Sequence, residues 1–201
     1  MVSRQAAESA AQASSVANKP VHSFLYYRGM ASATMIPVEE YLRTCYRPDC
    51  DYVDGQVLER NVGELEHSDL QGELIVYLRA RRKQWGIRVY PEMRVRVAPR
   101  RYRIPDICGM LEPVAKEPIF TTAPVFCIEI LSREDRWTRV RARIDDFLAM
   151  GVRYVWAIDP LARRAWQCEA GGKHEIHDLV LRTTNPDIEI PLREIFTEID
   201  S

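Results

Sequence analysis

The sequence lacks the features of an extracellular, zinc-binding or membrane protein. Its five cysteines are an odd number and include no C-x-x-C pair, which argues against both a disulfide framework and a zinc ribbon. No apolar run approaches the roughly 18 residues that span a bilayer. The Ala- and Ser-rich start lacks the apolar core of a signal peptide. We therefore expect a cytoplasmic protein with no membrane segment.

The chain also lacks an excess of charge of either sign. Its net charge is -1 and its pI is near 6.4, so any site for a polyanion must come from local clustering. Arginine does cluster, in residues 79–83, 94–103 and 133–143. Each run is either a solvated face or a phosphate-binding surface, and the sequence leaves both readings open.

The length and composition suit one globular domain. A chain of 201 residues that is 46% hydrophobic can bury a full-sized core but has little room for a second one. The small, polar residues 1–34 are predicted to be a disordered extension, with Met30 or Met35 as a candidate natural start. Residues 35–201 are predicted to form the domain.

Hydrophobic periodicity predicts a mixture of helices and strands along this domain. The Asp54-Gly55 dipeptide predicts a two-residue hairpin. Three helices are expected, at 37–45, at 64–85 and at 132–150, the last opened by a capping box of Ser132 and Asp135. Strands are expected in 86–99, 101–110, 123–131 and 152–159 and in three short segments between 163 and 192, before a closing turn at 193–199. This order predicts an α/β or α+β fold, a mixed β-sheet with helices against it.

One carboxylate stands in an unexpected place. The stretch APVFCIEILSRED puts Glu129 inside an apolar run that reads as a buried strand, and burying an ionised carboxylate costs several kcal/mol unless it is paired. The nearest upstream candidate to share a partner with it is Asp106, in IPDIC. A divalent cation such as Mg²⁺ would neutralise both acids. The alternative is that Asp106 caps a turn and Glu129 pairs with an arginine.

These residues also carry a family resemblance. A P-D pair, an acid inside an apolar strand and a helix with a basic residue resemble the PD-(D/E)xK nucleases. Within them the chain resembles the Uma2 family of restriction endonucleases, through DYVDG, a helix opening with His67, IPDIC, IEILS and RIDDFLAMGVRYVWAIDP, in order over residues 35–199. The resemblance implies a restriction-endonuclease-like core, a mixed sheet flanked by helices, and Mg²⁺- or Mn²⁺-dependent hydrolysis of DNA.

The resemblance also assigns roles by position. Asp106 and Glu129 would be the metal-binding and catalytic acids, and Arg143 stands where this family has its catalytic lysine. Arginine stays protonated, so Arg143 cannot act as a general base, although it can orient a water or stabilise charge on phosphorus. The alternative is that Arg143 pairs with Asp146 or Glu134 at the surface. The protein would then be a non-catalytic module that binds nucleic acid or another protein.

Further candidates are less sharply defined. His67 is either a core histidine or a residue of the cleft, where the resemblance places it. Glu73 is a candidate for a further acid of the cleft, in competition with Glu92. Binding to the DNA backbone is expected from basic residues in the arginine runs, with the candidates Arg103, Arg136 and Arg139. A homodimer is expected only by analogy with nucleases that cut both strands.

Overall fold

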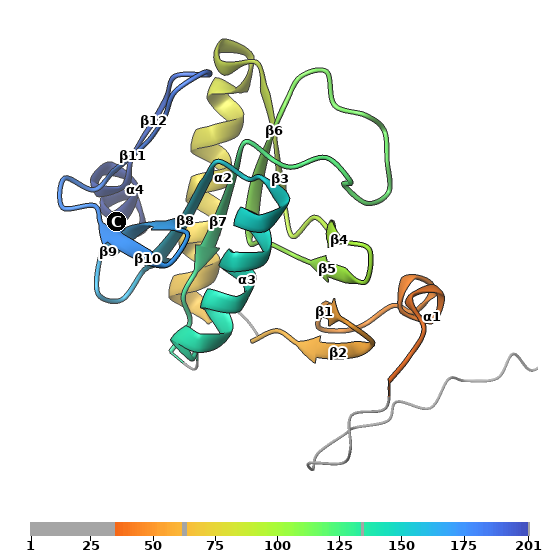
Figure 1. Cartoon of the computed structure of the whole chain (residues 1–201). Coiled ribbons are helices and arrows are strands. Elements are labelled where there is room, and N and C mark those ends of the chain that lie inside the picture. Colours follow the sequence, from red (N-terminus) through yellow and green to blue (C-terminus); the bar gives the residue numbers. More distant parts are fainter. Residues whose placement is uncertain (1–34, 62–63, 134, 201) are drawn as a thin grey trace, which may run out of the picture. The chain divides into compact units, whose positions relative to one another are not determined.

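The computed structural model describes residues 35–61, 64–133 and 135–200 (Figure 1). Everything below concerns these residues. The extension predicted for residues 1–34 lies outside the described residues, so its disorder stays a prediction.

A six-stranded mixed sheet is the centre of the domain, as the sequence predicts. Its strands lie in the order β10-β9-β8-β7-β6-β3, and only the β7–β8 pair is parallel. A parallel pair needs a long crossover, which here contains helix α3 (Trp137–Met150). The strands are β3 (Ile87–Pro91), β6 (Ile107–Leu111), β7 (Phe126–Ile130), β8 (Tyr154–Asp159), β9 (Arg164–Glu169) and β10 (Gly172–Glu175).

Helices cover both faces of this sheet (Figure 1). On one face, helix α2 (Leu65–Trp85) packs Leu70, Leu74 and Leu78 in one core cluster with alternate residues of β7. On the other face, α3 packs in a second cluster that contains Cys127 of the same strand. The period of two along β7 therefore places Glu129 on the α3 face, two residues after Cys127. None of the helices in the described ranges is long and apolar enough to cross a membrane.

Smaller elements complete the domain. The hairpin predicted at Asp54-Gly55 is confirmed, because both residues have a positive φ, +50° and +102°. A four-stranded sheet has the order β2-β1-β5-β4, and β11 pairs with β12. These elements are α1 (Val38–Arg43), β1 (Cys50–Val53), β2 (Gln56–Glu59), β4 (Val95–Ala98), β5 (Arg101–Arg103), β11 (Val180–Thr183), β12 (Ile188–Pro191) and α4 (Leu192–Ile199).

Local predictions were wrong in three respects. The closing turn at 193–199 is instead helix α4, because Leu192, Ile195 and Phe196 form a buried face at helical spacing. The runs 86–99 and 101–110 are each two strands and not one, β3 and β4 in the first and β5 and β6 in the second, and the two strands of each run belong to different sheets. The first run is interrupted at Glu92, whose φ is +47°, and the second at Pro105, a residue that has no backbone N–H for a sheet.

The third error concerns the start of α3. Ser132 does not cap the helix, which begins at Trp137 after the N-cap residue Arg136. The predicted pairing of Ser132 with Asp135 does form, since the Ser132 backbone N–H donates to Asp135 Oδ2 over 2.8 Å. This bond closes a turn between β7 and the helix, so the S-x-x-D pattern was recognised but assigned to the wrong structure.

A buried ionic network connects the small sheet to α3. Arg103 donates through Nη1 to Asp51 (2.9 Å) and through Nε to Asp146 (2.7 Å), and all three residues are buried. The Ile104 N–H also donates to Asp51, over 3.0 Å. The expectation that Arg103 binds DNA is therefore wrong. Its guanidinium lies inside the domain, and protein carboxylates already accept its hydrogen bonds.

We expect the substitution Asp51→Ala to lower the free energy of unfolding by about 3 to 5 kcal/mol, because it leaves the buried Arg103 charge without one of its two carboxylates. Urea denaturation measures this change. The matched control is Asp178→Ala, which removes an exposed acid that also pairs with an arginine, Arg182, and little change is expected there. An effect of Asp51→Ala no larger than the control would contradict this account of the network.

Candidate active site

The two acids singled out in the sequence face each other across neighbouring strands. In the antiparallel β6–β7 pair, Ile107 lies opposite Ile128, and the next step of this register sets Asp106 opposite Glu129. The Ile130 N–H donates to Asp106 Oδ2 over 2.7 Å. Both acids are buried. The structure thus brings together the two residues that the sequence proposed as a pair.

The partner of Glu129 is Arg143. Its Nε and Nη2 lie 2.7 and 2.6 Å from Glu129 Oε2, whereas the alternative partner Asp146 belongs to the network around Arg103. Burial raises the pKa of the Glu129 carboxyl to about 7; Arg143 works against this rise and the Asp106 charge adds to it. Glu129 Oε1 is buried and has no hydrogen-bond partner among the described residues.

Asp106 has two cationic neighbours, Arg60 and His67. Arg60 Nη2 donates to Asp106 Oδ1, and His67 Nε2 lies 3.4 Å from Oδ2. Burial alone would raise the pKa of Asp106, but the His67 hydrogen bond and the Arg60 charge hold it below its usual value. Burial likewise opposes the charged form of His67, and Asp106 outweighs it, so the pKa of His67 is raised. Of the two readings of His67, the structure supports the cleft.

Glu73 does not line the cleft. Two adjoining hollows border Asp106, one of them about 270 Å³ in volume, and Glu92 lines this larger one. The α2 residue beside them is Gln71, whose Nε2 donates to the Asp106 carbonyl over 2.9 Å. A residue two positions further along a helix lies roughly 200° around its axis. The prediction for Glu73 was therefore wrong, and its competitor Glu92 lies in the cleft.

The remaining candidates for DNA contact lie near the start of α3. Arg136 and Arg139 are exposed, and their side chains have no ion-pair partner within the described ranges. The neighbouring Arg133 differs, because it pairs with Glu64 and Glu66 of the α2 start. The surface beside the cleft therefore presents two arginines that remain available to a phosphate backbone.

Sequence reasoning missed several residues of the cleft. Arg60 and Asn61 follow the β2 strand, and Asn61 Nδ2 donates to Asp135 Oδ1 (3.0 Å) across the cleft. Gln71 was missed as well. The one available signal was position: Arg60 and Asn61 lie between the hairpin and the helix that opens with His67. Hydrophobic periodicity describes one strand or helix at a time. It therefore cannot predict that Arg60, which follows a strand of one sheet, reaches Asp106, which lies beside a strand of another.

The donor set suits a divalent cation in kind and number. Mg²⁺ is usually held by one or two carboxylates and keeps several waters, and Glu129 Oε1 is a buried acceptor without a partner. The described part of the chain contains no cluster of three or more His, Cys, Asp or Glu side chains arranged for a metal. Asp106 and Glu129 are the carboxylates that could hold a cation here, in competition with the arginines that now pair with them.

A family model described as "Putative restriction endonuclease", Uma2, matches residues 38–196. The chain belongs to the Uma2 family. Its fold is similar to the crystal structure of a "putative nuclease belonging to DUF820" from Anabaena variabilis. The TM-score is 0.71 at 22% identity, and the match covers 82% of this chain and 99% of that one. No curated protein matches the sequence.

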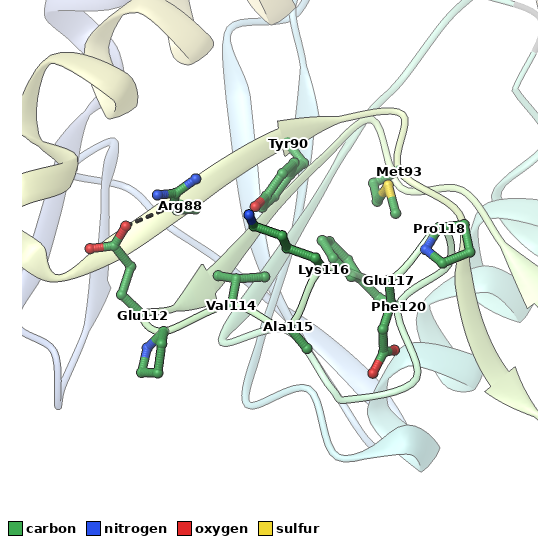
Figure 2. Close-up of a pocket in the computed structure, with 11 residues that line it drawn as sticks. Arg88, Tyr90, Met93, Glu112, Val114, Ala115, Lys116, Glu117, Pro118 and Phe120 are labelled. Atoms are coloured by element: carbon green, nitrogen blue, oxygen red, sulfur yellow. Dashed lines mark hydrogen bonds and ion pairs between the residues drawn. The ribbon is translucent and has the colours of Figure 1, made fainter.

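A larger pocket among the described residues of this Uma2 protein lies elsewhere. It has a volume of about 780 Å³ and is bordered by Arg88 and Tyr90 of β3, by Phe120 and by the loop 112–118 (Figure 2). It shares no lining residue with the hollows around Asp106. Arg88 is turned toward Glu112, with Nε 2.7 Å from its carboxylate (Figure 2). Size alone therefore does not indicate the functional site here.

The raised pKa of Glu129 predicts how the stability of this Uma2 protein depends on pH. The Glu129 carboxyl binds its proton more tightly in the folded chain than in the unfolded chain, where its pKa is near 4.5. Its contribution to stability is therefore complete below about pH 4.5 and is lost as the pH rises through about 7. We expect the free energy of unfolding to fall over this range by at most about 3 kcal/mol, as measured by urea denaturation at pH 5 and pH 8.

The variant Glu129→Gln keeps the shape of the side chain but cannot ionise. It should therefore remove this part of the dependence of the free energy of unfolding on pH, which is the slope measured here. A smaller slope in the same direction should persist, because the raised pKa of His67 stabilises the fold below its ordinary value of 6.5 and is lost at higher pH. An unchanged slope in Glu129→Gln would show that the carboxyl is ionised throughout the range.

Proposed function

We propose that this Uma2 protein is a divalent-cation-dependent endonuclease that hydrolyses phosphodiester bonds in DNA. The observation that carries the proposal is the placement of Asp106, the residue before β6, beside Glu129 of β7, with Arg143 directed at Glu129. All three residues lie inside the segment that matches the restriction endonuclease family. Two adjacent carboxylates and a fixed positive charge are what metal-assisted phosphodiester hydrolysis requires.

Asp106 and Glu129 would hold Mg²⁺ or Mn²⁺. Such an ion, when bound, polarises a phosphoryl oxygen and lowers the pKa of a water. The other residues of the cleft keep the acids in position. The Ile130 N–H and His67 restrain the Asp106 carboxylate, and α3 carries Arg143 over the sheet to Glu129.

Arg143 replaces the lysine that the family resemblance leads us to expect. Since a guanidinium does not lose its proton, Arg143 cannot take a proton from the attacking water. Its role in the proposal is electrostatic: it fixes the Glu129 carboxylate and stabilises negative charge that develops on the phosphate. The buried side of the cleft strengthens this interaction, because the local dielectric is lower than that of water.

One observation favours the second candidate, a non-catalytic module that binds nucleic acid or protein. Both acids already have arginine partners, Arg60 for Asp106 and Arg143 for Glu129. Two carboxylates are thus balanced by two guanidinium groups without any metal ion. A site that has lost catalysis could keep such pairs for stability alone.

Binding of Mn²⁺ by calorimetry, together with plasmid cleavage, tests the proposal. We expect the wild type to bind the ion and Asp106→Asn and Glu129→Gln to abolish binding. Cleavage should fall by on the order of a thousandfold in both variants, because a metal supplies several kcal/mol of transition-state stabilisation. The control Asp178→Asn alters an exposed acid paired with Arg182 and should match the wild type.

Arg143→Lys separates the two candidate functions. Lysine can lose its proton in a tuned site, so an intact nuclease should cleave faster with this substitution. If neither the wild type nor Arg143→Lys cleaves DNA or binds the ion, the binding module is the better description.

The two exposed arginines should govern affinity for DNA. Each phosphate contact adds about one to the slope of log affinity against log salt, so Arg136→Gln and Arg139→Gln should each lower that slope by about one in fluorescence anisotropy. Arg182→Gln, at an exposed arginine of β11, is the control. A slope that is the same in all three variants and the wild type would remove Arg136 and Arg139 from the DNA interface. A homodimer, which would bring two such sites to one duplex, stays a prediction.

A further inference from the structure

Arg60 has no role in the proposed reaction, although it occupies the centre of the cleft. It follows directly after β2, its side chain is 11% exposed, and it donates to Asp106 Oδ1. Its guanidinium thus contacts the oxygen atom that a metal ion would need. A residue in this place either prevents metal binding or moves when the metal binds.

We infer that Arg60 is an exchangeable counter-ion, which neutralises Asp106 when no cation is bound and moves to Glu92 when a divalent cation takes its place. The inference rests on the proposed function. It adds a residue that sets the affinity for the metal and a second acid that receives the displaced charge.

Charge balance requires that one cationic group leaves. The two acids face Arg60 and Arg143, and His67 lies beside Asp106. A divalent ion added to this set would place an excess of positive charge beside two buried acids, at a cost that rises as the local dielectric falls. Binding is favourable only if a guanidinium moves away from the acids.

Arg60 is better placed to move than Arg143. Arg143 belongs to the middle of α3 and makes two contacts with one oxygen of Glu129. Arg60 lies just beyond the end of a four-residue strand and has a second carboxylate within reach, since its Nη1 is 3.9 Å from Glu92 Oε1. A small rotation of the Arg60 side chain would exchange one acid for the other.

Glu92 is held beside Asp106 by its backbone. Its N–H donates to the Asp106 carbonyl over 3.2 Å, and its φ is +47°, a value that residues other than glycine rarely adopt. Its side chain is 54% exposed, so this carboxylate stays in contact with solvent. An exposed acid next to a buried one is suited to accept a guanidinium that the buried acid releases.

Calorimetric titration of the full chain with Mn²⁺ tests the inference. We expect Arg60→Gln to bind the ion roughly tenfold to a hundredfold more tightly than the wild type, because a charge-assisted hydrogen bond no longer competes for Asp106. The matched control is Arg88→Gln, which removes an exposed arginine paired with Glu112 away from the cleft and should leave the affinity unchanged.

A double-mutant cycle tests the exchange itself. Glu92→Gln should weaken Mn²⁺ binding in the wild type, since Arg60 loses its second acceptor, and should have no effect in the Arg60→Gln background. If Glu92→Gln weakens binding equally in both backgrounds, Glu92 is itself a ligand and the exchange is overturned. Arg60→Lys serves if Arg60→Gln does not fold. Lysine keeps the positive charge but lacks the planar guanidinium, so the affinity of Arg60→Lys for Mn²⁺ should lie between those of the wild type and Arg60→Gln.

The outcomes separate this inference from the proposed function. Equal Mn²⁺ affinity in the wild type and Arg60→Gln, with loss in Glu129→Gln, would overturn the exchange and leave the metal-dependent nuclease standing. An absence of binding in the wild type and in every Arg60 variant would overturn the metal site, and with it both the nuclease and the exchange.

Discussion

The cost of burying the Glu129 carboxylate is the constraint on which the cleft depends. A charge inside a sheet must be paired, and Arg143 of α3 is the group that pairs with it. Because the parallel β7–β8 pair requires a crossover, α3 passes over the strand that carries Glu129 and returns the arginine to it. The position of the helix, the buried acid and the orientation of Arg143 are therefore one arrangement, and none of them would be stable alone.

A second buried charge in the domain is also paired with charges of opposite sign. Arg103 is buried between Asp51 of β1 and Asp146 of α3, one turn beyond Arg143. This network attaches the small sheet to the helix that borders the cleft. The small sheet in turn ends at β2, after which Arg60 reaches Asp106. Charged contacts in the interior thus connect the small sheet, α3 and the acids of the cleft, which explains why the side chains of Arg60, Arg103 and Arg143 are largely buried.

Local patterns in the sequence were informative where one strand or helix decides the outcome. The Asp54-Gly55 hairpin, the long helix ended by Gly86 and the acid inside the apolar strand β7 could each be read from a few neighbouring residues. Errors arose where a residue has two local readings. Arg103 belongs to a basic run that looks like a surface, and Glu73 shares a helix with His67, but packing directs the first inward and the second away from the cleft.

It follows from the sequence alone that a carboxylate lies inside a strand, that Asp106 belongs to the β-rich segment before it and that a helix with Arg143 comes after it. These conclusions rest on the periods of two in strands and 3.6 in helices and on the cost of an unpaired buried charge. All three are properties of a short stretch of chain. Which arginine pairs with which acid depends on contacts between distant parts of the chain. Arg60 and Asp106 are far apart in the chain and meet because two separate sheets pack together, and such long-range contacts depend on the packing of the whole domain rather than on the pattern of either segment.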